Sequence, residues 1–403
     1  MSIEIHGTVA PGFEPVRDAF RENFELRGEI GASVAAYVDG RKVVDLWGGK
    51  ADTATARAWG QDTPGVVFST TKGMVATAFL MLEDRGLIDL DKRVAHYWPE
   101  FGRDGKADIT VRTLLNHRAG LCAVDEKLKL EDFSDPAKVE SVIVKQVPLW
   151  EPGTDQGYGA TAFGMYAQPL FQRVAGESLG TFLRREVFTP LKADVHLGLP
   201  LDQNARVATL YPVTRDRVLF KMLPLVARGT GVEGELYRAV LFGKGSAPRR
   251  AFTNPLHGKP GMNRLNEPAV RAMELPWMNA IATADGLARV YGALGRGGEL
   301  DGTRLVSEAA IGRVARKQSW SNHDRVLCKP LGFSQGFTKD EAHLISPHEA
   351  SFGHTGAGGS VGFADPTHKL GMSYVMNRMD HHVRSPRCVA LCRAMYQSLE
   401  GWT

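Results

Sequence analysis

Hydrophobic and polar positions along the chain predict strands near both of its ends. Residues 31–38 form an apolar run that ends at Asp39-Gly40, a strong two-residue hairpin signal, so residues 41–47 should return as a second strand. Near the other end, residues 361–364 and 372–376 flank a turn and have the composition of strands.

The pattern between these strands is mostly helical. Helices are predicted at residues 16–26, 163–174, 179–187 and 283–294, and a last one covers residues 385–399. Strands at both ends with helices between them predict one sheet built from both termini, with a helical lobe inserted into it. We assign residues 1–65 and 275–403 to an α/β sheet lobe, and residues 66–274 to a mostly helical lobe.

Residues 201–270 form a less regular insert within the helical lobe. Nine basic and three acidic residues lie between Arg206 and Arg250, with apolar pieces at residues 218–220 and 240–242. One interpretation is a surface insertion with a solvated basic face. The other is a lid over an active site, in which case deleting residues 215–245 should change the acyl-chain preference.

Ser69 and Lys72 stand three residues apart in front of a run, residues 75–82, that is apolar on nearly all sides. As a helix this run would be buried, and residues i and i+3 would lie on one face. Burial lowers the pKa of a lysine, so Lys72 could act as a base for the weak nucleophile Ser69. The alternative is that Ser69 caps a helix and that Lys72 is a solvated first-turn residue.

Composition narrows the classes of function. The chain has 403 residues, enough for a sizeable core, and its net charge of +4 with no long basic tract argues against nucleic acid as a partner. Residues 1–7 lack the features of a signal peptide, and no apolar stretch is long enough for a membrane span. The few cysteines show no disulfide-framework spacing, so we expect a cytoplasmic protein; they are Cys122, Cys328, Cys388 and Cys392.

Two patterns that suggest chemistry are better explained by structure. Residues 176–180 spell G-x-S-x-G, but a helix precedes them, so Gly176 should end that helix and Ser178 should be a loop or cap residue. His381 and His382 precede Cys388 and Cys392, which are one turn apart on a helix and should be buried as small hydrophobes. We therefore expect no metal and no cofactor.

Three separated motifs carry a resemblance to a known family. Ser69-x-x-Lys72 comes first, Tyr158 follows the turn Glu151-Pro152-Gly153, and His354-Thr355-Gly356 comes late, on a predicted strand. The order resembles the S-x-x-K, S-D-N and K-T-G motifs of serine β-lactamases and penicillin-binding proteins, in the class C-like branch where tyrosine replaces the serine of the second motif. Four stretches look like family VIII carboxylesterases: residues 62–74, 109–121, 150–158 and 352–360.

The resemblance covers most of the chain and implies a fold and a reaction. The fold would be an α+β sandwich of the β-lactamase/transpeptidase type, with an antiparallel sheet, a mostly helical second lobe and the active site between the two. Ser69 would form an acyl-enzyme, with Lys72 and Tyr158 sharing the acid and base work, and the Lys72 ammonium would lower the pKa of Tyr158.

The resemblance also implies binding residues. The oxyanion hole would use the backbone N–H groups of Ser69 and Ala357. The substrate would bind along His354, Thr355, Gly356 and Gly358, where glycines would let it approach the backbone closely.

Departures from the family pattern indicate the substrate. The second motif is Tyr158-Gly159-Ala160 without the lactamases' carboxamide, and the third has His354 in place of their lysine. Both changes favour short- to medium-chain uncharged esters, so we expect a small-molecule ester as the substrate; the oligomeric state does not follow from the sequence. The alternatives are a β-lactamase, a D-amino peptidase or a transacylase of the same fold, and, from another class, a catalytically silent scaffold.

Overall fold

The sheet of this protein is built from both ends of the chain. The computed structural model describes residues 3–213, 223–255, 258, 261–339 and 344–401. Its main sheet has nine strands in the order β1-β3-β2-β14-β13-β12-β11-β10-β9, and all neighbours run antiparallel. The N-terminal strands are β1 (Ile5–Val9), β2 (Gly31–Val38) and β3 (Arg41–Gly49). The C-terminal strands are β9 (Ser319–Ser321), β10 (Leu331–Ser334), β11 (Phe337–Lys339), β12 (Phe352–Thr355), β13 (Val361–Asp365) and β14 (Leu370–Met376).

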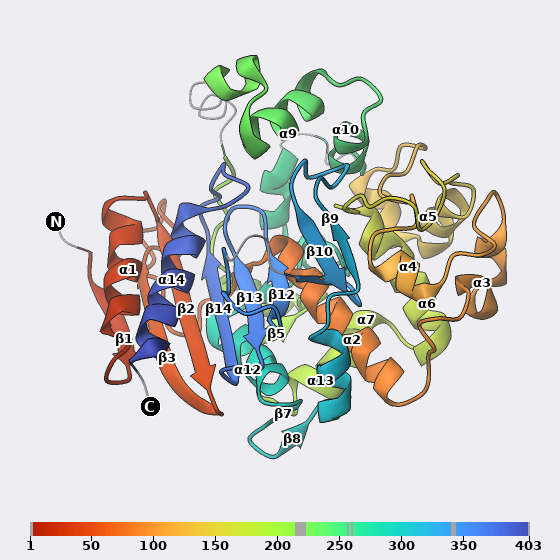
Figure 1. Ribbon diagram of the computed structural model, residues 1–403. Coiled ribbons are helices and arrows are strands. Elements are labelled where there is room, and N and C mark those ends of the chain that lie inside the picture. Colours follow the sequence, from red (N-terminus) through yellow and green to blue (C-terminus); the bar gives the residue numbers. More distant parts are fainter. Residues whose placement is uncertain (1–2, 214–222, 256–257, 259–260, 340–343, 402–403) are drawn as a thin grey trace.

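Helices cover both faces of this sheet. The terminal helices α1 (Glu14–Glu25) and α14 (Pro386–Glu400) pack together on one face, and α12 (Ala284–Gly295) packs on the other (Figure 1). Every residue of β2 is buried for this reason, which explains its continuous apolar run. Gly371 lets α12 lie directly on β14, because a Cβ there would come within 2.0 Å of the backbone nitrogen of Gly292. The predicted α+β sandwich is confirmed.

Between β3 and α12 the chain is mostly helical. Its helix α2 (Thr71–Asp84) is buried at its first twelve positions and packs against α6 (Ala162–Ala175) and α7 (Leu179–Leu183) and against β11 and β12 of the main sheet. The other helices of this region include α3 (Val94–Tyr97), α4 (Val111–Leu115), α5 (Pro136–Ile143) and α11 (Pro268–Arg271). A small sheet of β4 (Gly65–Val66), β6 (Ile281–Ala282) and β5 (Val195–His196) joins three parts of this region. The hairpin β7 (Glu299–Leu300) and β8 (Thr303–Arg304) and helix α13 (Glu308–Val314) follow α12.

The insert at residues 201–270 contributes α9 (Gly231–Phe242) and α10 (Ala247–Phe252), at the top of Figure 1. The predicted apolar piece at residues 218–220 lies outside the described residues. Ala251 of α10 belongs to the same apolar cluster as Tyr158 and Ala160. Thr161 Oγ1 also donates to the carbonyl of Asn254 at 2.6 Å, so the insert forms part of the wall behind Tyr158.

Local patterns fix several ends of helices. Gly176 ends α6 in the left-handed conformation, and the side chain of Ser178 caps α7, as predicted for this G-x-S-x-G. The single helix predicted at residues 179–187 is instead α7 followed by a π-helical turn, Arg184–Phe188. Cys388 and Cys392 are buried on α14, as predicted.

In the described part of the chain, no helix is both long enough and apolar enough to span a bilayer.

Candidate active site

A strained residue places Ser69 at the entrance of α2. Val67 donates to the carbonyl of Ala280 at 3.0 Å, which continues the pairing of β4 with β6. Phe68 then has φ +47°, a left-handed conformation that costs an L-residue roughly 1–2 kcal/mol. The buried Phe68 ring holds this turn, and a short 3-10 helix, Phe68–Thr70, leads into α2. Ser69 therefore stands half-buried at the junction between a strand and a helix.

Lys72 is fully buried on the first turn of α2 and points at Ser69. Its Nζ lies 3.1 Å from Ser69 Oγ, 2.8 Å from the carbonyl oxygen of Ala160 and 2.9 Å from that of Trp277. Burial holds the pKa of Lys72 well below its usual range. The alternative that Lys72 is a solvated residue of a helix cap is therefore wrong.

Tyr158 completes the group from a distant segment. Lys72 Nζ lies 5.0 Å from the centre of its ring, and the Ser69 side chain is near enough to its hydroxyl to lower the pKa of Tyr158 in part. Burial raises the pKa of Tyr158 and outweighs the lowering by Ser69. The expectation that the Lys72 ammonium would lower this pKa is wrong, because the same burial that disfavours a phenolate also disfavours an ammonium beside it.

Asp324 holds the Tyr158 backbone, and no motif in the sequence pointed to it. Its buried Oδ1 accepts from the backbone N–H groups of Tyr158 at 3.0 Å, Val326 at 2.9 Å and Leu327 at 3.0 Å. Its other oxygen accepts from the Gln156 side chain at 3.2 Å. Burial raises the pKa of Asp324 in spite of these donors. The carboxyl group thus fixes the turn after β9 to the segment that carries Tyr158.

His117 also supports the segment that carries Tyr158. Its Nδ1 accepts from the backbone N–H of Gly159 at 2.9 Å, and its ring lies 4.2 Å from Phe333 and 5.1 Å from Phe163, between ring centres. Burial and the nearby Lys72 hold the pKa of His117 well below its usual range, so the ring is neutral. The residue lies within a stretch that resembles family VIII esterases, but its role could not be assigned from the sequence.

The third motif lies at the end of β12, beside Lys72 and Tyr158. His354 Nδ1 donates to the carbonyl of Thr355 at 2.7 Å, and its ring centre is 5.9 Å from that of Tyr158. Burial, with Lys72 nearby, lowers the pKa of His354 to about 3. His354 is therefore neutral at pH 7, and it supplies no positive charge where the lactamases have lysine.

The glycines after His354 serve the packing of the protein itself. A Cβ on Gly356 would come within 2.1 Å of Ser360 Oγ and 2.4 Å of the Val67 carbonyl oxygen. A Cβ on Gly358 would come within 2.9 Å of Met376. These contacts within the chain require glycine at both positions whether or not a substrate is bound, and the close approach of a substrate to this backbone stays a prediction.

The same turn ties Ala357 to Ser69. Gly356 N donates to the Ser360 carbonyl at 2.7 Å, and Ser360 Oγ donates to the carbonyl of Val67, two residues before Ser69, at 2.8 Å. Thr70 Oγ1 lies 3.2 Å from Ser360 Oγ. The two backbone segments that carry the amides of Ser69 and Ala357 are therefore held against each other.

A cavity of about 70 Å³ lies along β12 and borders His354, Thr355 and Gly356. Apolar side chains form much of its remaining wall, among them Leu331, Phe363 and Val389. Ser69, Lys72 and Tyr158 do not line it. The cavity is thus a neighbour of the Ser69 group and shares the predicted substrate-binding strand with it.

A serine hydroxyl and a desolvated amine from the entrance and first turn of α2 meet a phenol from a distant segment, where the helical lobe joins an antiparallel sheet. This fold and this group of side chains define the class of the protein, a serine hydrolase with the β-lactamase fold.

Comparison with known proteins identifies the family. Residues 16–390 match the β-lactamase family, and the chain belongs to this family. It is 35% identical over 383 residues to the esterase/beta-lactamase LipL of Mycobacterium tuberculosis (strain ATCC 25618 / H37Rv), covering 93% of this chain and 83% of LipL.

Solved structures agree with this membership. A family VIII carboxylesterase is similar with a TM-score of 0.86 and 40% identity, covering 98% of this chain and all (100%) of that one. A penicillin-binding protein homologue from Caulobacter crescentus has a TM-score of 0.84 and 33% identity, with coverage of 98% and 100%. The resemblance inferred from the motifs is confirmed, and the protein is a hydrolase of the esterase/β-lactamase family.

Proposed function

We propose that this protein is a carboxylesterase that cleaves short- to medium-chain uncharged esters through an acyl-enzyme on Ser69. The observation that carries the proposal is the environment of Lys72. The amine is fully buried 3.1 Å from Ser69 Oγ, and it also hydrogen-bonds to two backbone carbonyl oxygens.

This environment suits a neutral lysine that acts as the base for acylation. A neutral amine has two N–H bonds and one lone pair. When the two N–H groups donate to the carbonyls of Ala160 and Trp277, the lone pair is left for the Ser69 hydroxyl. Lys72 then takes the Ser69 proton as Oγ forms its bond to the acyl carbon.

Tyr158 is the acid that releases the alcohol. Its raised pKa keeps it protonated, and its hydroxyl adjoins Ser69 Oγ. As the tetrahedral intermediate collapses, the C–O bond to the alcohol breaks and Tyr158 gives that oxygen a proton, which the Lys72 ammonium replaces. A water molecule then attacks the acyl-enzyme by the reverse path. The amides of Ser69 and Ala357 would stabilise the oxyanion, a contribution of about 10²- to 10³-fold per donor in other hydrolases.

Two features favour uncharged esters over β-lactams. Ala160 lacks the carboxamide that could hold the amide side chain of a lactam, and the neutral His354 attracts a substrate carboxylate weakly. The largely apolar cavity along β12 could hold an acyl chain beside His354, Thr355 and Gly356. The names of the similar proteins, an esterase/beta-lactamase and a family VIII carboxylesterase, support ester hydrolysis as the reaction.

An acyl-chain series tests the proposal. Hydrolysis of p-nitrophenyl esters from acetate to laurate would be measured for the wild type and for Ser69→Ala, Tyr158→Phe and Ser178→Ala. Ser178 is the matched control, because it is a helix-cap serine in the other candidate motif. We expect Ser69→Ala to abolish turnover and labelling by a fluorophosphonate probe, Tyr158→Phe to lower kcat, and Ser178→Ala to preserve both readouts.

The alternatives give different results. Nitrocefin turnover as efficient as butyrate ester turnover would identify a β-lactamase. Cleavage of D-Ala peptides would identify a peptidase, and acyl transfer to an added alcohol in preference to water would identify a transacylase. Folded wild-type protein that the fluorophosphonate does not label at Ser69 would indicate a silent scaffold.

A further inference from the structure

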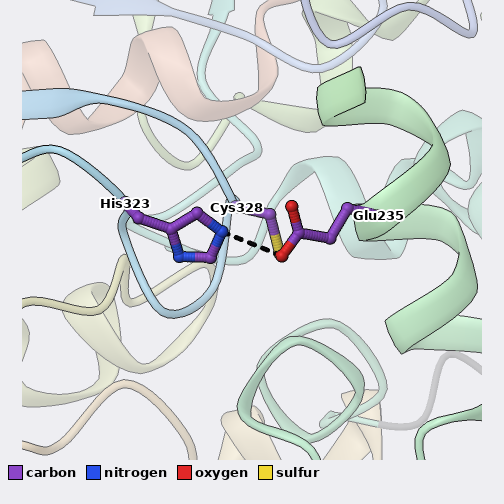
Figure 2. A group of neighbouring side chains, drawn as sticks. All are labelled: Glu235, His323 and Cys328. Atoms are coloured by element: carbon purple, nitrogen blue, oxygen red, sulfur yellow. Dashed lines mark hydrogen bonds and ion pairs between the residues drawn. The ribbon is translucent and has the colours of Figure 1, made fainter. Parts of the chain in front are cut away.

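Three different metal-binding side chains meet at the edge of the insert. Glu235 projects from α9, and His323 and Cys328 come from the turn between β9 and β10 (Figure 2). Their ligand atoms all lie within 4.8 Å of one another, and His323 Nε2 is 2.8 Å from Glu235 Oε1. The side chains of His323 and Glu235 are 56% and 47% exposed, so an ion can reach them, whereas Cys328 is buried behind them.

We propose that Glu235, His323 and Cys328 form a binding site for one zinc-like divalent cation. A thiolate, an imidazole and a carboxylate are the ligand types that Zn²⁺ takes in proteins, and three protein ligands leave a fourth position for water. Bonds of about 2.0–2.3 Å in a tetrahedral site place ligand atoms roughly 3.3–3.8 Å apart. The spacing between His323 and Glu235, 2.8 Å, is shorter than that range, and no spacing exceeds 4.8 Å, so rotations of these two exposed side chains would seat the ion.

Two other clusters fit such an ion less well. Asp365 meets His348 and His368, but its carboxylate is buried and also accepts from the Tyr396 hydroxyl at 2.9 Å. Asp380 meets His381 and His382 and also accepts from the Ser385 hydroxyl at 2.9 Å. Neither cluster contains a thiolate, the ligand that most favours zinc over magnesium or calcium.

The proposed site lies against the turn that positions Tyr158. His323 and Cys328 flank Asp324, Cys328 N donates to the Asp324 carbonyl at 2.9 Å, and Asp324 N donates to the Lys329 carbonyl at 2.8 Å. An ion held by Glu235 as well would fasten α9 to this turn. Metal binding should therefore stabilise the folded protein and fix the insert beside the proposed active site.

The test uses the full-length protein after treatment with a chelator. Co²⁺ reports on the ligands, because a cysteine thiolate gives it a charge-transfer band in the near ultraviolet. We expect one equivalent to bind with this band, Cys328→Ser to abolish the band, and His323→Asn to weaken Zn²⁺ binding by more than about tenfold. Zn²⁺ should raise the thermal midpoint of the wild type and leave that of Cys328→Ser unchanged.

Two matched variants serve as controls. Cys392→Ser removes another buried thiol and His368→Asn alters another cluster, and both should keep the wild-type affinity and absorption. The proposal is overturned if micromolar Zn²⁺ does not bind, if the cobalt complex lacks the thiolate band, or if His368→Asn abolishes binding while Cys328→Ser does not. These readouts need no ester turnover, so they stand apart from the test of the proposed function.

Discussion

The contact between Gly73 and Tyr291 gives a sharp test of how α2 is seated. Gly73 follows Lys72, and a Cβ at this position would come within 2.0 Å of Tyr291 Oη. Tyr291 is fully buried, and within the described residues its hydroxyl has no hydrogen-bond partner. Gly73→Ala must therefore move a packed ring or move the first turn of α2, which carries Lys72.

The magnitude follows from two opposing effects. Overpacking of this kind costs about 3 kcal/mol, which is the upper end of the usual range. Alanine is about 1 kcal/mol more favourable than glycine in a helix. Gly73→Ala should therefore destabilise the fold by about 2 kcal/mol. In Tyr291→Phe the nearest remaining ring atom would be the Cζ, at 3.3 Å. This tight contact should offset the gain of alanine over glycine, so the same substitution should be nearly neutral. The coupling between the two changes should thus be about 2 kcal/mol.

Calorimetry and ester hydrolysis measure the effect. For a chain of this length, 2 kcal/mol corresponds to about 2 °C in the thermal midpoint, because the entropy of unfolding grows with the number of residues. Gly73→Ala should also lower kcat, and Tyr291→Phe should restore it. An equal loss in both backgrounds, or no loss in either, would refute the steric explanation. Tyr291→Phe alone is the control and should be close to the wild type.

Two further predictions concern the supports of the site. Asp324→Asn replaces the carboxylate oxygen that accepts from the Gln156 side chain by an NH₂ group, so two donors would face each other and Tyr158 should shift. We expect kcat to fall by about 10- to 100-fold, with a smaller change in KM. Asp155→Asn, which alters the ion pair with Arg325 in the same region, should leave kcat unchanged; equal effects would contradict the positioning role of Asp324. Burial lowers the pKa of His354 from 6.5 to about 3, so the unfolded chain binds more protons between these values and stability should fall as the pH drops through this window. Thermal midpoints at pH 7 and pH 5 should therefore differ less in His354→Asn than in the wild type, and an unchanged difference would show that His354 does not titrate in this way.

Local patterns in the sequence determined the elements of this fold. The apolar run of β2 and the Asp39-Gly40 turn were sufficient to predict the first hairpin, because turn chemistry and hydrophobic continuity act over a few residues. The pairing of Ser69 with Lys72 is also local, since residues three apart meet on one helical turn. The order of three motifs then identified the family, and with it the fold.

Only the tertiary structure decided which distant groups surround these residues. The carbonyl of Trp277, the carboxylate of Asp324 and the ring of His117 come from segments with no sequence signal for their roles. The charge states also depended on the whole molecule. Burial by the surrounding lobes lowers the pKa of Lys72, as the apolar run after this residue had predicted, but it also raises the pKa of Tyr158, which the family resemblance had suggested would be lowered. Desolvation is a sum over every neighbour in space, so the burial of Tyr158 by distant segments could not be found from spacing along the chain.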